Sequence, residues 1–128
     1  MRIRFKKWAR PELEASKFYI DNPEEIKGKW KEQFKNKENP IYLELGCGKG
    51  KFISQIAIQN PQINFIAIDL VDAMLGLAKR EIEQTYNQAQ KEIDNVILTR
   101  FDIQRIDLIL SKEDNIKRIY INFCNPWP

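Results

Sequence analysis

The stretch Ile41-Tyr-Leu-Glu-Leu-Gly-Cys-Gly-Lys-Gly50 decides the fold of this chain. Its first half is a short run rich in apolar residues, as in a strand buried within a sheet. Its second half contains so much glycine that it can form only a tight turn. Phe52, Ile53, Ile56 and Ala57 follow at helical spacing. The stretch therefore predicts a strand, a glycine turn and a helix in succession.

The same alternation continues along the chain. Apolar runs at residues 63–70, 96–101 and 116–123 predict three more strands, and an amphipathic helix with Asp72 as its N-cap separates the first two of them. Strands that alternate with helices favour a parallel sheet with right-handed crossovers. We therefore expect an α/β fold, a doubly wound, Rossmann-like parallel sheet with helices on both faces.

The chain before the first of these strands divides into two parts. Residues 1–22 show no sustained period, which predicts an irregular arm rich in basic and aromatic residues. Pro23, followed by two glutamates, predicts the start of a helix that carries Trp30 and Phe34 on one face. We therefore expect an arm of residues 1–22 and a single domain of residues 23–128.

Composition excludes several classes of protein. The 128 residues suffice for one domain with a core, and no apolar run approaches the roughly 20 residues that a membrane helix needs. The N-terminus lacks the apolar region of a signal peptide, so we expect a cytoplasmic protein. Two cysteines and no histidine exclude a disulfide framework, serine–histidine triads and most zinc sites. Any catalysis or ligand binding must then use carboxylates, amides, backbone dipoles or a cofactor. We expect no bound metal.

The glycine turn has the features of a cofactor site. Gly46, Gly48 and Gly50 permit positive φ and let a ligand lie against the backbone, at the strand ends where ligands bind in such sheets. Glu44 would repel a pyrophosphate but attract a cationic sulfonium or ammonium group. Asp69 follows Gly48 by 21 residues, the spacing at which an acid meets ribose hydroxyls. Together these residues favour S-adenosyl-L-methionine (AdoMet) over NAD, and a turn that merely needs glycine would not explain the two acids.

Two further residues near the strand ends have open interpretations. Asp102 follows the third predicted strand, where it could reach the amino group of an adenine or cap the next helical segment. Cys47 lies within the turn, where a small buried side chain is a better interpretation than a reactive thiol.

Basic residues gather at the start of the chain without any acid among them. They are Arg2, Arg4, Lys6, Lys7 and Arg10. Phe5 and Trp8 lie between these charges, and interleaved cations and aromatic rings suit RNA phosphates and bases. The segment fits a nucleic-acid contact, and a solvated basic terminus is the alternative.

Four stretches of the sequence resemble the bacterial tRNA (guanine-N7)-methyltransferases, which modify guanine 46 in the variable loop of tRNA. They are residues 1–9, 22–30, 44–52 and 121–128, the last reading Ile-Asn-Phe-Cys-Asn-Pro-Trp-Pro. The resemblance spans essentially the whole chain. It implies a Rossmann-like class I AdoMet-dependent methyltransferase fold, AdoMet as cofactor and tRNA as partner.

The resemblance also implies roles for individual residues. Glu44 and Asp69 match the family's AdoMet-binding acids, although glutamate is common where this chain has Asp69. Asp102 falls in the region used for the adenine. Asn125 matches a position close to both AdoMet and the target base, commonly aspartate, and is the candidate catalytic residue as well as a cofactor contact. Arg2, Arg4, Lys6, Lys7 and Trp8 are the candidate RNA-binding residues.

Members of this family continue beyond Pro-Trp-Pro with a segment rich in lysine and arginine and with more strands. We therefore expect a sheet truncated after its fourth predicted strand, and a chain that is either part of a longer protein or a non-catalytic AdoMet-binding fragment. Strand 116–123 would then expose unpaired backbone and an apolar face, through which a homodimer could form.

An alternative enzyme is an amino-methyltransferase that uses Asn125 in an Asn-Pro-Trp-Pro loop. Such loops hold a planar amino group on adenine, cytosine or glutamine. This alternative does not account for the basic and aromatic start of the chain.

Overall fold

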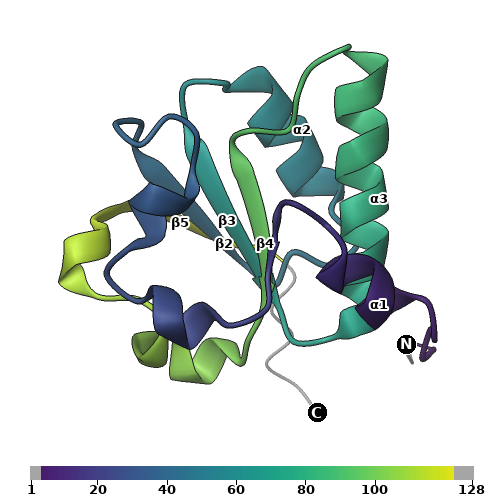
Figure 1. Cartoon of the computed structure of the whole chain (residues 1–128), viewed down its shortest axis with the longest axis horizontal. Coiled ribbons are helices and arrows are strands. Elements are labelled where there is room, and N and C mark those ends of the chain that lie inside the picture. Colours follow the sequence, from purple (N-terminus) through teal and green to yellow (C-terminus); the bar gives the residue numbers. More distant parts are fainter. Residues whose placement is uncertain (1–3, 123–128) are drawn as a thin grey trace.

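A parallel sheet of five strands forms the centre of the structure, a computed structural model that describes residues 4–122 (Figure 1). In spatial order the strands are β1-β4-β3-β2-β5, and each neighbouring pair is parallel. Their bounds are β1 Tyr19–Ile20, β2 Ile41–Leu45, β3 Asn64–Asp69, β4 Val96–Arg100 and β5 Ile116–Ile121. The predicted α/β fold with a parallel sheet is therefore confirmed.

The α-helices of the described residues lie on one face of this sheet (Figure 1). Their bounds are α1 Ala9–Glu14, α2 Lys51–Gln59 and α3 Asp72–Gln88. Both α1 and α2 pack against α3. The core beneath them contains fully buried apolar side chains from helices and strands alike, namely Leu13, Phe65, Leu75, Ile82 and Leu98.

The opposite face of the sheet is covered by short 3-10 helices. Their bounds are η1 Pro23–Ile26, η2 Trp30–Gln33, η3 Ile103–Leu108 and η4 Lys112–Asp114. Trp30 and Ile109, both fully buried, pack there against Ile66 and Ile68 of β3. The sheet therefore has helices on both faces as predicted, but on this face they are short 3-10 helices of three to six residues.

The prediction of one helix from Pro23 is wrong. The chain instead turns at Gly28, whose φ is +82°, and this turn separates η1 from η2. The nearly fully buried carboxylate of Asp114 accepts hydrogen bonds from the backbone N–H groups of Gly28 at 2.8 Å and Trp30 at 3.0 Å. Because Asp114 lies more than 80 residues further along the chain, no local pattern could reveal this contact.

The prediction that residues 1–22 are irregular is wrong for α1 and β1. Helix α1 packs against α3 at Gly76, where an added Cβ would lie 2.9 Å from the Trp8 ring and 3.0 Å from Ala9 Cβ. Strand β1 pairs with β4, with Tyr19 opposite Leu98, and so adds a fifth strand to the four that were predicted. The division into an arm of residues 1–22 and a domain of residues 23–128 stays a prediction.

Helix α3 begins at Asp72, but this residue is not its N-cap as predicted. Val71 occupies the cap position with an extended backbone, and the Asp72 carboxylate forms ion pairs with Arg10 and Arg100 instead. The helix ends at Gln88.

Strand β5 lies at one edge of the sheet as the described residues define it. Its side chains Ile119 and Ile121 are 54% and 66% exposed, so the expected apolar edge is present. The last residue of the predicted strand, Phe123, lies outside the described residues. No helix within residues 4–122 has both the length and the apolar character needed to cross a membrane.

Gly50, the residue before α2, allows α2 and α3 to approach each other closely. Its φ is +83°, and an added Cβ would lie 2.6 Å from the Cα and 2.8 Å from the Cβ of Ala78 on α3. Backbone atoms cannot yield as a flexible side chain can. The missing Cβ of this glycine therefore serves the packing of two helices.

Gly50→Ala is expected to lower the free energy of unfolding by at least about 2 kcal/mol more than Gly28→Ala. Gly28 has nearly the same φ, +82°, but an added Cβ there would meet only Ser111 Oγ at 3.4 Å. The second variant thus measures the cost of the backbone conformation alone, about 1 kcal/mol. Urea denaturation of both variants tests this, and equal losses of stability would contradict the packing role.

Candidate functional site

The glycine turn joins β2 to α2 and is bound to the neighbouring strand. The N–H groups of Gly46 and Cys47 both donate to the carbonyl oxygen of Ile68 in β3, at 2.8 and 3.1 Å. Gly46 and Gly48 have positive φ values of 76° and 55°. The turn is therefore held at the carboxyl ends of β2 and β3, the two strands that the sequence placed at the site.

Cys47 is a buried filler within this turn. Its side chain is fully buried, and burial raises the pKa of its thiol well above the ordinary value. A thiol with a raised pKa is a poor nucleophile at neutral pH. This agrees with the structural interpretation of Cys47.

Asp69 connects the glycine turn to the loop that begins α3. Its Oδ2 accepts a hydrogen bond from Gly48 N at 2.9 Å, and its Oδ1 accepts one from Val71 N at 3.1 Å. The structure thus brings Asp69 and the turn together, as the spacing of 21 residues suggested. Each carboxylate oxygen retains a second lone pair with which it could accept a ligand hydroxyl.

Glu44 lies two residues before Gly46, and its carboxylate is buried with a hydrogen-bond partner for only one of its two oxygens within the described residues. Its Oε2 accepts a hydrogen bond from Asn122 Nδ2 at 3.0 Å, whereas its Oε1 is buried without any hydrogen-bond partner in the described chain. Burial raises the pKa of Glu44 to about 7, the Asn122 hydrogen bond opposes this rise, and the charge of Asp69 adds to it. A positively charged donor would satisfy Oε1 and offset the cost of burial.

Asn122 is a site residue that the sequence analysis did not single out. It follows β5 directly, just as Asp69 ends β3, and so lies at the same edge of the sheet. The predicted strand 116–123 placed Asn122 inside the strand, whereas β5 ends at Ile121. The available signal was a single polar residue near the end of the otherwise apolar run of residues 119–123.

Asp102 lies two residues after the end of β4, beside a crevice. Its Oδ1 accepts a hydrogen bond from Gln104 N at 3.0 Å, so the capping interpretation is confirmed for η3. Leu70, Phe101 and Asp102 line a crevice of about 400 Å³ together with Arg100 and Arg105. Leu70 follows Asp69 directly, so this crevice adjoins the acid that faces the glycine turn. The contact of Asp102 with an adenine stays a prediction.

Comparison with known proteins agrees with this geometry. Residues 38–128 match the model of a family described as putative methyltransferase. The chain belongs to this methyltransferase family.

Several relatives named tRNA (guanine-N(7)-)-methyltransferase match the full length of the chain. The one from Clostridium perfringens (strain 13 / Type A) is 60% identical over 128 residues, and the one from Clostridium acetobutylicum is 51% identical. The chain covers 58% and 57% of these relatives, respectively. It therefore spans little more than half the length of the relatives that it matches.

The basic segment that precedes α1 in this methyltransferase family member is largely exposed, but the ring of Trp8 within it is partly covered by other residues. Arg4 and Lys7 are exposed and Lys6 is half-buried. The Arg80 guanidinium lies 3.5 Å from the centre of the Trp8 ring, which also contacts Gly76, so one ring face is already covered. Phe5, which is 78% exposed, is the aromatic side chain available to a partner.

Two candidate site residues, Arg2 and Asn125, lie outside the described residues. The RNA contacts of Arg4, Lys6, Lys7 and Trp8 stay predictions. Within residues 4–122 there is no group of three or more Cys, Asp or Glu side chains that could hold a metal ion.

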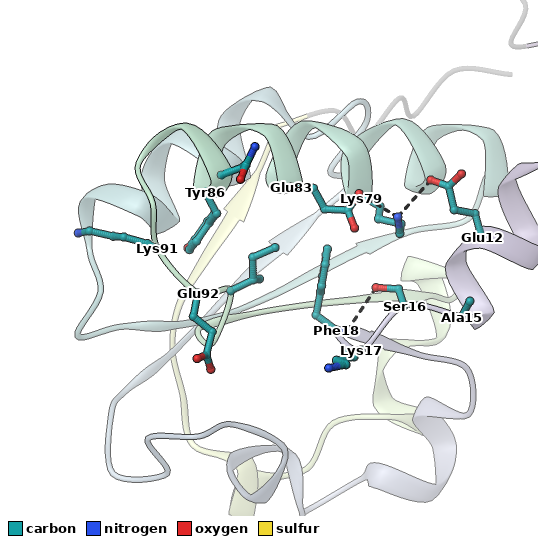
Figure 2. A pocket seen from close by; sticks show the side chains of 12 residues that line it. Glu12, Ala15, Ser16, Lys17, Phe18, Lys79, Glu83, Tyr86, Lys91 and Glu92 are labelled. Carbon is teal, nitrogen blue, oxygen red and sulfur yellow. Dashed lines mark hydrogen bonds and ion pairs between the residues drawn. The ribbon is translucent and has the colours of Figure 1, made fainter.

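A larger groove, of about 550 Å³, lies between α3 and the segment that joins α1 to β1 (Figure 2). It contains no residue of the glycine turn. Along its rim Lys79 Nζ binds Glu12 at 3.1 Å and Glu83 at 2.9 Å (Figure 2). The Arg80 guanidinium and the Lys79 ammonium lower the pKa of Glu12 to about 2 against the effect of burial. The ion pairs of Glu12 with Lys79 and Arg80 fasten α1 to α3, whereas the Lys79–Glu83 pair lies within α3.

The free energy of unfolding is expected to fall by about 3 kcal/mol as the pH rises from about 4.5 to 7, because of Glu44. In this range the folded protein retains the proton of Glu44, whose pKa is about 7, while the unfolded chain, with a value of 4.5, has released it. The contribution of Glu44 to the free energy of unfolding is thus greatest below pH 4.5.

Glu44→Gln should remove this dependence, because glutamine carries no titrating proton. The chain has no histidine, so few other side chains titrate between pH 5 and 7. Urea denaturation at pH 5 and pH 7.5 measures the difference between wild type and variant. The same pH dependence in both proteins would show that Glu44 has an ordinary pKa.

Proposed function

We propose that the protein is an AdoMet-dependent methyltransferase that forms 7-methylguanosine at position 46 of tRNA. The observation that carries the proposal is the Oε1 of Glu44, which is buried beside the glycine turn without a hydrogen-bond partner among the described residues. The membership in a methyltransferase family supports AdoMet as the cofactor, and the names of the relatives support guanine N7 in tRNA as the target.

The residues at the strand ends fit AdoMet in charge and in shape. Glu44 would accept a hydrogen bond from the ammonium group of the methionine part, and Asp69 would accept hydrogen bonds from the ribose hydroxyls. The crevice lined by Leu70 and Asp102 would hold the adenine. When bound, AdoMet supplies an electrophilic methyl group. Two carboxylates beside one turn disfavour a pyrophosphate and therefore NAD.

The chemistry at guanine N7 demands little of the protein side chains. N7 carries a lone pair and has no proton to lose, so no general base is needed, and the lack of histidine is no obstacle. The protein must hold N7 in line with the methyl group, an effect of proximity that can contribute several kcal/mol. Asn125, which matches a position near the target base, would orient the base or the cofactor through its amide.

The exposed basic segment would contact the phosphates of tRNA. Arg4, Lys6 and Lys7 precede α1, and α1 packs on α3 close to the start of that helix, where Asp72 binds Arg10. RNA bound along this segment would therefore lie on the same side of the molecule as the cofactor loop. We expect such a protein to act in the cytoplasm, where tRNA is found.

We propose that the protein forms a homodimer through the exposed edge of β5. Ile119 and Ile121 would be buried in such a contact. Sedimentation as a single chain at micromolar concentration would rule it out.

Methylation of unmodified tRNA by the protein is expected at guanine N7 and should be lost in Glu44→Ala. Nuclease digestion followed by mass spectrometry identifies the methylated base and atom. Lys49→Ala, which removes an exposed side chain of the same turn, is the matched control and should retain activity. A methyl group on an exocyclic nitrogen would instead favour the amino-methyltransferase, and AdoMet binding without turnover would favour a non-catalytic fragment.

Replacing Arg4, Lys6 and Lys7 by alanine is expected to weaken tRNA binding and to flatten its dependence on salt. Each lost phosphate contact lowers the slope of log K against log salt concentration by about 0.7–0.9. Filter binding at several salt concentrations measures this slope. The triple variant Lys31→Ala, Lys35→Ala and Lys37→Ala removes the same charge from another exposed segment and should keep the wild-type slope.

A further inference from the structure

Asp72 joins three elements of the fold next to the proposed cofactor site. Its Oδ2 accepts a hydrogen bond from Arg10 Nε at 3.0 Å and forms an ion pair with Arg10 Nη2 at 2.8 Å, and Arg10 belongs to α1. On its other side, Arg100 Nε at the end of β4 lies 3.5 Å from Oδ1. Asp72 is the first residue of α3, so one carboxylate holds α1, α3 and β4 together.

The turn between Asp69 and Asp72 is held mainly at its two ends. At one end Asp69 accepts hydrogen bonds from Gly48 N and Val71 N. Between the ends, Leu70 and Val71 are 48% and 38% exposed, so core packing does little to define their positions. The other end is Asp72, whose side chain is only 23% exposed and whose only hydrogen-bond donor among the described side chains is Arg10. Arg10 therefore makes the closest side-chain contact at this end of the turn, and the Arg100 ion pair at 3.5 Å is longer.

We propose that Arg10 is a positioning residue for the cofactor site, which it supports through Asp72 by holding the turn of residues 69–72 in place. This inference rests on the proposed function, because residues 69 and 70 form the ribose side and one wall of the proposed AdoMet site. It assigns to Arg10 a role distinct from phosphate binding. The guanidinium suits this role, since it stays charged and its planar group combines a hydrogen bond from Nε with an ion pair from Nη2 on the same carboxylate oxygen.

A purely structural role of α1 is the competing explanation, and the structure offers a matched control for it. Glu12 also fastens α1 to α3, through Lys79 Nζ at 3.1 Å (Figure 2) and Arg80 Nη2 at 2.7 Å. These two partners lie about two turns beyond Asp72 along α3. Loss of Glu12 should loosen α1 to a similar extent without touching the turn of residues 69–72.

The experiment compares wild type with Arg10→Gln, Arg10→Lys and Glu12→Gln. Calorimetric titration with AdoMet in the absence of RNA gives the Kd, and thermal unfolding without ligand gives the stability of each protein. Arg10→Gln is expected to raise the Kd about two- to fivefold, as for the loss of a partly exposed ion pair. Arg10→Lys, which keeps one charged contact, should restore most of the affinity. Glu12→Gln should lower the melting temperature and leave the Kd unchanged.

Each remaining outcome overturns the inference in a different way. If wild type binds AdoMet and Arg10→Gln binds it equally well, Arg10 does not position the site although the proposed function stands. An equal loss of affinity in Glu12→Gln would assign the effect to the packing of α1. If wild type does not bind AdoMet at all, the proposed function fails and the inference fails with it.

Discussion

A carboxylate removed from water, that of Glu44, stands near the carboxyl end of strand β2, and the site depends on it. Glu44 is fully buried, yet within residues 4–122 only one of its oxygens has a hydrogen-bond donor, which is Asn122. Nearby, Asp69 adds a second negative charge and raises the pKa of Glu44 further. An arrangement of this kind is unfavourable by itself, because burial of a charge without a full set of partners costs free energy. It becomes favourable when a cationic ligand group occupies the free position.

The parallel sheet explains how such residues meet. Strands β2, β3, β4 and β5 all run in the same direction, so their carboxyl ends share one edge. Glu44, Asp69, Asp102 and Asn122 each stand at or near one of these ends. Gly50 allows α2 and α3 to pack closely behind the edge, and Gly46 and Gly48 keep the turn flat against β3. The fold thus concentrates acids and amides where ligands bind in open α/β sheets.

Sequence patterns predicted the parts of the fold that depend on short-range information. Strand β2, the glycine turn and α2 follow from contiguous residues, and the pairing of Asp69 with the turn follows from the regular length of a strand–helix–strand unit. Contacts between distant residues escaped this reasoning. Helix α1 contains Pro11 and has only six residues, so it depends on packing against α3 rather than on its own propensity. The two turns η1 and η2 replace a predicted helix because Asp114 binds the intervening backbone. Asn122 was missed as the partner of Glu44 because the two residues lie 78 positions apart in the chain.

Calorimetric titration with AdoMet between pH 5.5 and 8.5 tests the central claim most directly, because Glu44 must be ionised to bind an ammonium group. Wild type should bind AdoMet with release of a proton near neutral pH, and below about pH 7 its affinity should fall about tenfold per pH unit. Glu44→Gln should bind weakly and with no such dependence over the same range. Equal affinity and equal pH dependence in the two proteins would contradict the account, because Glu44 would then take no part in holding the cofactor.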